Sequence, residues 1–262
     1  KLAHVMEAVR LIKKELKGKV PLIGFSAAPW TLMYYLVGGS SRKNQGNGMF
    51  WLQNHPEESK AILDMLTDIV IDYLAAQVEA GADMLQLFEA MGDFIDEESF
   101  YVWAMPCMSR IASELKQRCP TVPLLVFPRG ASYSLEALQA AGYDVVTLDT
   151  SCDRSDIRKR LMIAAGAADV MSKQVAAIQG NFDVTLLRAN ERGNILNTPE
   201  IVRNEVRSML VELGPQKLIA NLGEGLTGKE DPTLVAEFID SIHELSEEMI
   251  KSQAVASTLT SQ

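Results

Sequence analysis

Short apolar runs alternate with longer amphipathic stretches along the chain, and this alternation limits the possible folds most. Six runs are typical of strands: Val20–Ser26, Ala82–Glu89, Pro123–Pro128, Asp144–Asp149, Val175–Gly180 and Lys217–Gly223. Apolar residues at three- and four-residue steps predict helices over Pro56–Ala80, Phe100–Arg118, Ser134–Ala141, Pro199–Leu213 and Pro232–Ile250. Strands that alternate with helices predict βαβ units and a parallel sheet buried on both faces.

The size of the chain favours a closed barrel. A (β/α)8 barrel, or TIM barrel, has eight strands and typically ~250 residues. Six units in 262 residues predict such an α/β barrel with its first units absent, and the start at Lys1 predicts that an upstream segment is missing. An open doubly wound sheet is the alternative, but GFSAAPW after the first strand is not a phosphate-binding glycine loop.

The remaining segments predict the domain limits. We expect a single domain over residues 1–250 and a flexible tail over 251–262, because that tail is small and polar. The polar, glycine-containing segments Ser40–Gly48 and Asn190–Asn197 predict mobile connections.

Charge and cysteine content exclude several classes of partner. The formal charge is 25 − 34 = −9 without a long basic cluster, so we expect no nucleic-acid partner. No apolar run reaches the ~18 residues needed to cross a bilayer, so we expect no transmembrane segment. Cys107, Cys119 and Cys152 lack the CxxC spacing and are predicted to be reduced thiols.

Polar side chains gather where the predicted strands end, the edge at which barrel enzymes carry their catalytic groups. They are Glu89, Arg129, Asp149, Gln179, Asn181, Asp183 and Glu224. Strand ends meet water in any fold, so a structural role is an equal alternative for each residue. These residues alone indicate a barrel with a polar mouth and no identifiable cofactor.

Histidine- and metal-based chemistry fits the pattern poorly. His4, His55 and His243 fall on predicted helices or their starts, so a serine or cysteine nucleophile has no base at the strand ends. A hard-metal site from Glu89, Asp149 and Glu224 is a weaker alternative, because no known ligand spacing is present. We therefore expect no metal and no cofactor.

Five separated motifs carry a resemblance to a known family. They are PLIGFSAAPWTLMYYLVGG at Pro21–Gly39, then GADMLQLFE, AGYDVVTLD, IQGNFD and KLIANLGEGL. In these motifs, over about residues 2–247, the chain resembles the uroporphyrinogen decarboxylase family.

The resemblance implies a (β/α)8 barrel, usually a homodimer, that works without a metal or prosthetic group. Such enzymes remove carbon dioxide from the four acetate side chains of uroporphyrinogen to give coproporphyrinogen, in haem and chlorophyll biosynthesis. They occur in the cytosol and in plastids, and either compartment is implied here. The tetrapyrrole lies over the barrel mouth, where arginines bind its carboxylates.

The resemblance also assigns site residues. Tyr35 matches a tyrosine that hydrogen-bonds a substrate carboxylate, and Phe25 and Phe88 match apolar residues on the floor of the site. Ala90 stands where the family has a substrate-contacting serine, and Glu224 stands where it has a histidine. The arginine-rich segment and the key aspartate of the family are expected upstream of Lys1, so no catalytic residue is assigned within this chain.

Two further departures lie nearby: Thr150 replaces a tryptophan, and Asp93 is an additional acid. A carboxylate at Glu224 would repel a polyanion, since two unit charges ~4 Å apart repel by about 4 kcal/mol at an effective dielectric of roughly 20. Protonation of Glu224 or pairing with Arg129 would weaken that repulsion.

Three functions therefore stay open. The first is an active decarboxylase, and the second is a catalytically inactive paralogue that serves as a structural or assembly subunit of a larger complex. The third is a binding protein for another tetrapyrrole.

Overall fold

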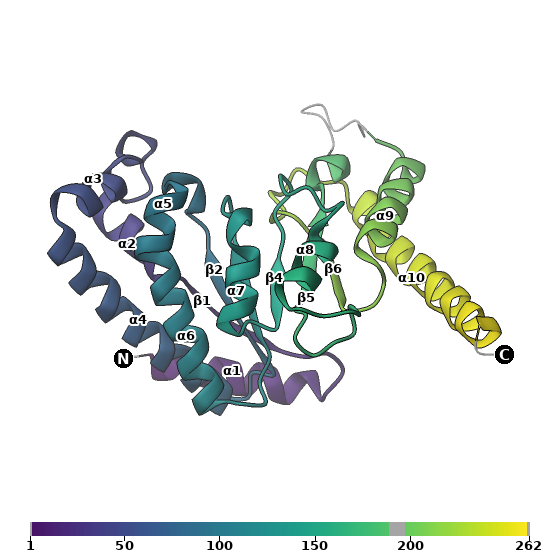
Figure 1. The fold of residues 1–262 in the computed structure, drawn as a ribbon, viewed down its shortest axis with the longest axis horizontal. Helices are drawn as coiled ribbons and strands as arrows, with labels where there is room; N and C mark the ends of the chain where they lie inside the picture. The colour runs from purple at the N-terminus through teal and green to yellow at the C-terminus, as the bar shows by residue number, and fades with distance from the viewer. Residues whose placement is uncertain (1, 189–196, 261–262) are drawn as a thin grey trace. The chain divides into compact units, whose positions relative to one another are not determined.

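The structure, a computed structural model, describes residues 2–188 and 197–260. Its chain forms two compact units, Lys1–Val146 and Thr147–Gln262 (Figure 1). Each unit combines parallel strands with the helices that connect them. The expectation of a single domain over residues 1–250 stays a prediction.

The strands of the first unit are parallel and follow one another in chain order. They are β1 (Ile23–Ala27), β2 (Met84–Glu89), β3 (Leu124–Pro128) and β4 (Val145–Thr147), whose last residue opens the second unit. In the register, Phe25 faces Gln86 and Phe88 faces Phe127. Because side chains alternate between the faces of a strand, Phe25, Phe88 and Phe127 share one face.

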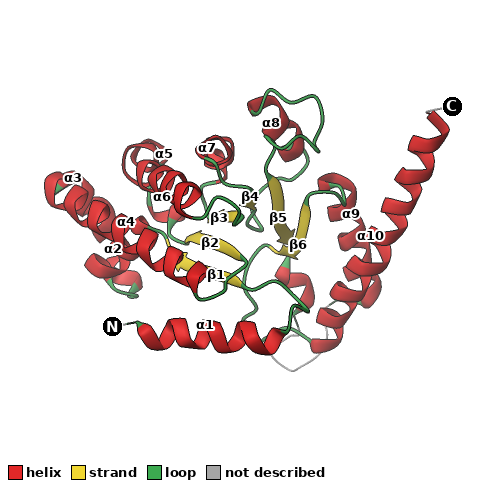
Figure 2. Cartoon of the chain, turned by 90° about the horizontal axis from the view of Figure 1, so that it is seen from below, coloured by secondary structure: helices red, strands yellow, loops and turns green. Residues whose placement is uncertain are grey.

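Helices connect these strands and cover the other face. They are α1 (Ala3–Leu16), α2 (Pro29–Gly38), α3 (Asn47–Asn54), α4 (Pro56–Glu79), α5 (Glu97–Ser99), α6 (Met105–Arg118) and α7 (Leu135–Ala141). Short turns of helix stand between them: η1 (Arg42–Asn44), η2 (Gly92–Phe94), η3 (Phe100–Ala104) and η4 (Ser132–Ser134). Figure 2 shows α4, α6 and α7 on the outer side of β1, β2 and β3.

The sequence of α4 explains why it is the principal helix of this unit. Pro56 occupies its first turn together with two glutamates, an arrangement that suits the positive end of a helix. Leu63, Val70 and Leu74 lie on its buried face at helical spacing. The helix contacts β1, α2 and α6 and so forms much of the apolar core.

The second unit contains β5 (Ala177–Phe182) and β6 (Leu218–Leu222), which are parallel. Its helices are α8 (Ile157–Ala164), η5 (Val184–Leu187), α9 (Pro199–Leu213) and α10 (Pro232–Thr260). The nitrogen of Leu148, just after β4, donates to the carbonyl of Gln179 in β5. α9 packs against α10, and the rings of Phe182 and Phe238 lie 4.6 Å apart between β5 and α10.

All six predicted strands and all five predicted helices are present in the described residues. The helices α2, α3, α5 and α8 were not predicted as elements, and α1 was expected only through the placement of His4 on a helix. The segment Ser40–Gly48, predicted to be a polar connection, contains η1 and the start of α3. The segment Asn190–Asn197 lies outside the described residues except for its last residue.

The predicted tail is helical as far as the structure describes it. α10 continues to Thr260, beyond the predicted helix end at Ile250. An ion pair of Lys251 with Glu247 and a hydrogen bond from Ser252 to the Glu248 carbonyl support the added turns. Residues 261–262 lie outside the described part.

Candidate functional site

Three phenylalanines form an aromatic row, defined here as Phe25, Phe88 and Phe127, on one face of the first unit. The ring centroids of Phe25 and Phe88 lie 5.9 Å apart, and those of Phe88 and Phe127 lie 6.1 Å apart, both edge to face. Such contacts are favourable beyond the area they bury. Phe25 is nevertheless 60% exposed, so the row ends in an apolar surface open to a ligand.

Sequence reasoning missed Phe127, although a signal for it exists. Phe88 and Phe127 are each the second-last residue of a strand, and parallel strands in this register place such residues side by side. The matching positions of the phenylalanines in LFE and VFP therefore predict that Phe88 and Phe127 are neighbours in the sheet.

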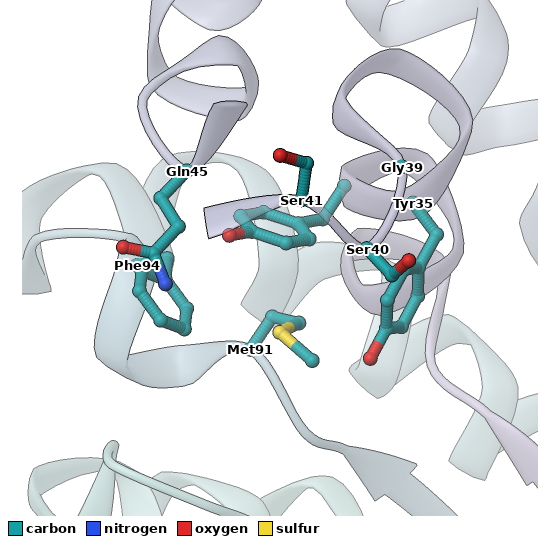
Figure 3. A pocket seen from close by; sticks show the side chains of 8 residues that line it. Tyr35, Gly39, Ser40, Ser41, Gln45, Met91 and Phe94 are labelled. Atoms are coloured by element: carbon teal, nitrogen blue, oxygen red, sulfur yellow. The ribbon is translucent and has the colours of Figure 1, made fainter. Parts of the chain in front are cut away.

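Tyr35 lies on α2, and its ring meets that of Tyr34 at 5.8 Å. It is 44% exposed and lines a pocket of about 130 Å³ together with Tyr34, Gly39, Ser40, Ser41, Gln45, Met91 and Phe94. Figure 3 shows Tyr35 and Ser40 on one side of this pocket, Gln45 on the other and Met91 below them.

Ala90 follows β2 and lies close to the first turn of α2. Its nitrogen donates to the Thr31 hydroxyl at 2.8 Å, and Trp30 Nε1 donates to the carbonyl of the next residue, Met91, at 3.0 Å. The backbone at Ala90 is therefore held firmly, but the side chain offers no hydroxyl to a ligand.

The side chain of Glu89 lies on the face of β2 opposite to the aromatic row. An acid that binds a ligand beside the aromatic row would lie on the same face as the row. Its carboxylate is fully buried and accepts hydrogen bonds from the Thr31 hydroxyl at 2.5 Å, the Thr31 nitrogen at 3.3 Å and the Met91 nitrogen at 3.0 Å. Burial raises the pKa of Glu89 to about 7 against the opposing effect of these bonds. Because Thr31 lies in the first turn of α2, Glu89 completes the start of that helix.

Asp93 is exposed and lies close to the loop after β3. A Cβ atom at Gly130 would lie 2.2 Å from Asp93 Oδ1, and Gly130 has a φ of +74°. A Cβ atom at Gly92 would lie 2.2 Å from the Arg129 carbonyl oxygen. The loops after β2 and β3 therefore interlock, and both glycines are required by close approach.

The polar residues at the strand ends of the second unit mostly bond to one another or to nearby backbone. Asp149 accepts from the Ser151 nitrogen and hydroxyl at 2.9 and 2.6 Å and from the Cys152 nitrogen at 3.0 Å. Asn181 Nδ2 donates to the carbonyls of Asp149 and Cys152. These bonds shape the loop after β4, which favours the structural role.

Two more of these residues have structural partners. Gln179 accepts from the Thr147 hydroxyl at 2.8 Å. Asp183 accepts from the nitrogen and hydroxyl of Thr185 and caps η5.

Glu224 is exposed just beyond β6. The preceding Gly223 is buried, and a Cβ atom there would lie 2.5 Å from the Thr150 hydroxyl oxygen, so the glycine permits a close approach of two loops. The other flanking residue, Gly225, has open space around it. Only one of the two glycines beside Glu224 is therefore required by packing.

Glu230 organises the loop that follows Glu224. Its carboxylate accepts from the Thr227 nitrogen and hydroxyl and from the Gly228 nitrogen, each at 2.9 Å, and it pairs with Arg188 at 3.4 Å. Burial alone would raise the pKa of Glu230, but the hydrogen bonds lower it to about 2. Sequence reasoning missed this residue.

The histidines lie on helices or at a helix start, as predicted. His4 is in α1, His243 is in α10, and His55 precedes α4, with its ring 4.9 Å from that of Trp51. Residues 2–188 and 197–260 contain no group of three or more His, Cys, Asp or Glu side chains that could hold a metal ion. Among those residues no helix is long and apolar enough to cross a membrane.

Comparison with known proteins decides the family. The model of the uroporphyrinogen decarboxylase (URO-D) family matches residues 1–245. The chain belongs to the uroporphyrinogen decarboxylase family. The resemblance found in the five motifs is thus confirmed, and with it the α/β TIM-barrel fold class.

Individual relatives agree with this assignment. The chain is 40% identical over 248 residues to uroporphyrinogen decarboxylase from Salinibacter ruber, a match covering 95% of this chain and 65% of that protein. It is 36% identical over 250 residues to the protein of that name from Mus musculus, covering 94% of this chain and 63% of the relative. The chain therefore spans somewhat less than two thirds of the length of these relatives.

A solved structure supports the fold alone. A methyltransferase from Methanosarcina mazei superposes with a TM-score of 0.68 at 20% identity, covering 92% of this chain and 63% of that one.

Proposed function

We propose that this chain is the larger part of a uroporphyrinogen decarboxylase, which removes carbon dioxide from the acetate side chains of uroporphyrinogen. The observation that carries the proposal is the family match over residues 1–245 together with the exposed aromatic row. Relatives that are 40% and 36% identical to this chain bear the name of that enzyme.

The aromatic row suits one part of such a substrate. An exposed phenylalanine at the end of a packed row offers an apolar surface, and pyrrole rings present flat apolar faces to such a surface. Tyr35, with its hydroxyl on the adjacent helix, can donate to a carboxylate. The assigned roles of Phe25, Phe88 and Tyr35 thus have a physical basis in the first unit.

A catalytically inactive subunit of a larger complex is the second candidate, because two residues depart from the family pattern. Ala90 has no hydroxyl, and Glu224 places an exposed carboxylate where a neutral or cationic side chain is expected. Even about a quarter of the 4 kcal/mol repulsion weakens binding roughly fivefold.

Turnover of the full-length protein separates the two candidates. Uroporphyrinogen III is supplied under anaerobic conditions, and coproporphyrinogen is quantified for the natural protein and for Ala90→Ser with Glu224→His. We expect the natural protein to form product and the double variant to form it faster. Product from the double variant alone would make the natural protein an inactive paralogue, and product from neither would exclude the decarboxylase.

A binding measurement tests the aromatic row itself. Phe25→Ser should weaken uroporphyrin binding at least fivefold while leaving the free energy of unfolding nearly unchanged, because the ring is already largely exposed. Phe50→Ser is the matched control, since Phe50 is 54% exposed on α3. Equal losses for both variants would remove the aromatic row from the site.

Dimer formation, membership of a larger complex and location in plastid or cytosol remain predictions. So does the third function, binding of another tetrapyrrole, which uroporphyrin binding without turnover would favour.

A further inference from the structure

The second unit has a pocket of its own, lined mostly by polar side chains. Its volume is about 260 Å³, and all of its lining residues lie between Thr147 and Gln262. We call it the acidic pocket and define it by Thr150, Arg154, Asn181, Asp183, Glu205 and Glu212. Among the described residues that line it, four carry carboxylates and only Arg154 carries a positive charge. The lining is therefore strongly negative.

Arg154 is already committed to two of these acids. Its Nη2 donates to Glu205 at 2.5 Å, and its Nε donates to Glu212 at 2.6 Å. The side chain of Arg154 is only 14% exposed. The guanidinium therefore offsets charge on α9, while Asp183 and a further lining residue, Asp153, keep theirs.

Asn181 is the residue that indicates a ligand. It is only 4% exposed, and its Nδ2 donates to the carbonyls of Asp149 and Cys152 at 2.9 and 3.0 Å. These two bonds fix the orientation of the amide and leave Oδ1 buried without a hydrogen-bond partner in the described part of the chain. The Thr150 hydroxyl is likewise buried there without a partner. Buried acceptors in this state cost free energy unless a donor reaches them.

Asp183 adds a charged acceptor to these two neutral ones. Its Oδ1 accepts from the nitrogen and hydroxyl of Thr185 at 2.8 and 2.7 Å. Its second oxygen, Oδ2, accepts no hydrogen bond from residues 2–188 and 197–260. The acidic pocket thus combines a carboxylate oxygen, an amide oxygen and a hydroxyl that have no donor of their own.

The charge and the acceptors limit the ligand to a cation that carries hydrogen-bond donors. A primary ammonium has three N–H donors and no acceptor, and hydrogen bonds from an ionised donor are the stronger ones. A metal ion is not favoured, because the described residues contain no group of three or more His, Cys, Asp or Glu side chains that could hold one. A volume of about 260 Å³ is several times the ~30 Å³ of one water molecule, so it accommodates an ammonium with a short alkyl stem.

We propose that the acidic pocket binds a primary ammonium ion on a short alkyl stem. Asp183 supplies the negative charge, and Asn181 Oδ1 and the Thr150 hydroxyl accept N–H bonds. The inference goes beyond the proposed function, since a substrate that carries carboxylates is repelled by this lining. A small free amine and the lysine side chain of a partner protein both carry this group, and the experiment below separates the two sources.

Thr150 provides a direct measurement because it lines the pocket and carries a methyl group. Full-length protein is labelled at the threonine methyl groups, and the Thr150 signal is assigned with Thr150→Ser. At constant ionic strength, propylammonium chloride should shift this signal saturably. Tetramethylammonium has the same charge without an N–H donor and should bind at least fivefold more weakly. Thr31 of α2, in the first unit, should not shift.

Two aspartate variants test the charged acceptor. Asp183→Asn retains an oxygen for the bonds from Thr185 and should weaken propylammonium binding at least fivefold. Asp169→Asn is the matched control in the same unit, because Asp169 Oδ1 also accepts from a backbone nitrogen, that of Met171 at 2.8 Å, but does not line the pocket. It should leave binding unchanged. If Asp183→Asn fails to fold, Asp153→Asn at an exposed position takes its place with the same expectation.

The source is tested with a lysine residue blocked at both backbone ends. Binding of the blocked lysine as tight as that of propylammonium identifies a lysine side chain, whereas binding of propylammonium alone identifies a small free amine. No saturable shift with propylammonium, equal binding of tetramethylammonium, or unchanged binding to Asp183→Asn would overturn the proposal. These measurements contain no uroporphyrinogen, so their failure leaves the decarboxylase proposal untouched.

Discussion

At the scale of single residues, buried carboxylates hold the loops and helix starts of this protein. Glu89 shows this most clearly: it ends β2, but its side chain bonds to Thr31 in α2. The sequence shows that an acid such as Glu89 ends a strand, and the ends of barrel strands are where catalytic groups are expected. Side chains alternate along a strand, so Glu89 lies on the face opposite to Phe88, but the sequence did not show that this face packs against Thr31 of α2.

Glu89 should make stability depend on pH. Its pKa is 4.5 in the unfolded chain and about 7 when folded, so the folded state binds more protons between these values. The protonated Glu89 side chain therefore contributes its full stabilisation of the folded state below pH 4.5, and this contribution is lost as the pH rises through 7. In Glu89→Gln we expect the difference in free energy of unfolding between pH 5 and pH 8 to shrink by about 1–3 kcal/mol.

Urea unfolding at both pH values, followed by tryptophan fluorescence, measures this difference. Glu98→Gln, an exposed acid of the same unit, is the control and should retain the natural pH dependence. An unchanged difference in Glu89→Gln would show that Glu89 titrates in its ordinary range.

At the scale of elements, clear start signals and regular apolar spacing made the long helices predictable. α9 begins at Pro199 and ends at Leu213, as predicted, because Thr198 caps it and Pro199 fits its first turn. α2 escaped prediction because PWTLMYYLVG is apolar on nearly every side, so it shows no helical period. α8, with eight residues, is too short to show one.

The cap of α9 gives a prediction for this element. The Thr198 side chain accepts from the Ile201 nitrogen at 3.3 Å. Thr198→Ala should therefore lower the free energy of unfolding by about 1 kcal/mol, measured by circular dichroism in urea. Thr198→Ser retains the hydroxyl and should stay close to the natural protein, and a similar loss in both variants would argue against the cap.

At the scale of the whole molecule, the two compact units can be observed separately. All three tryptophans and all six tyrosines precede residue 147, so aromatic fluorescence reports the first unit, while far-ultraviolet circular dichroism reports both. The second unit contains Glu230, whose folded pKa is about 2.

The two units should therefore respond differently to acid. Because the pKa of Glu230 is lower in the folded state than in the unfolded chain, its carboxylate stabilises the folded state at pH values above 4.5. This contribution to the free energy of unfolding is lost as the pH falls toward 2. Between pH 7 and pH 3 we expect the dichroism transition to move to lower urea than the fluorescence transition. Glu230→Gln should reduce the separation, and the part that stays is expected from Glu89, which stabilises the first unit at low pH. Coincident transitions of the natural protein at pH 3 would contradict the prediction.

The sequence by itself determined the alternation of strands and helices and the family, because periodicity and contiguous motifs are local properties. Only the tertiary structure decided which side chains meet. Strand register joined Phe127 to the aromatic row, and the packing of α2 beside β2 gave the buried Glu89 its partner Thr31. Helix packing buried Tyr34, and close loop contacts explain Gly223 beside the exposed Glu224. Such contacts depend on residues distant in sequence, which no local pattern records.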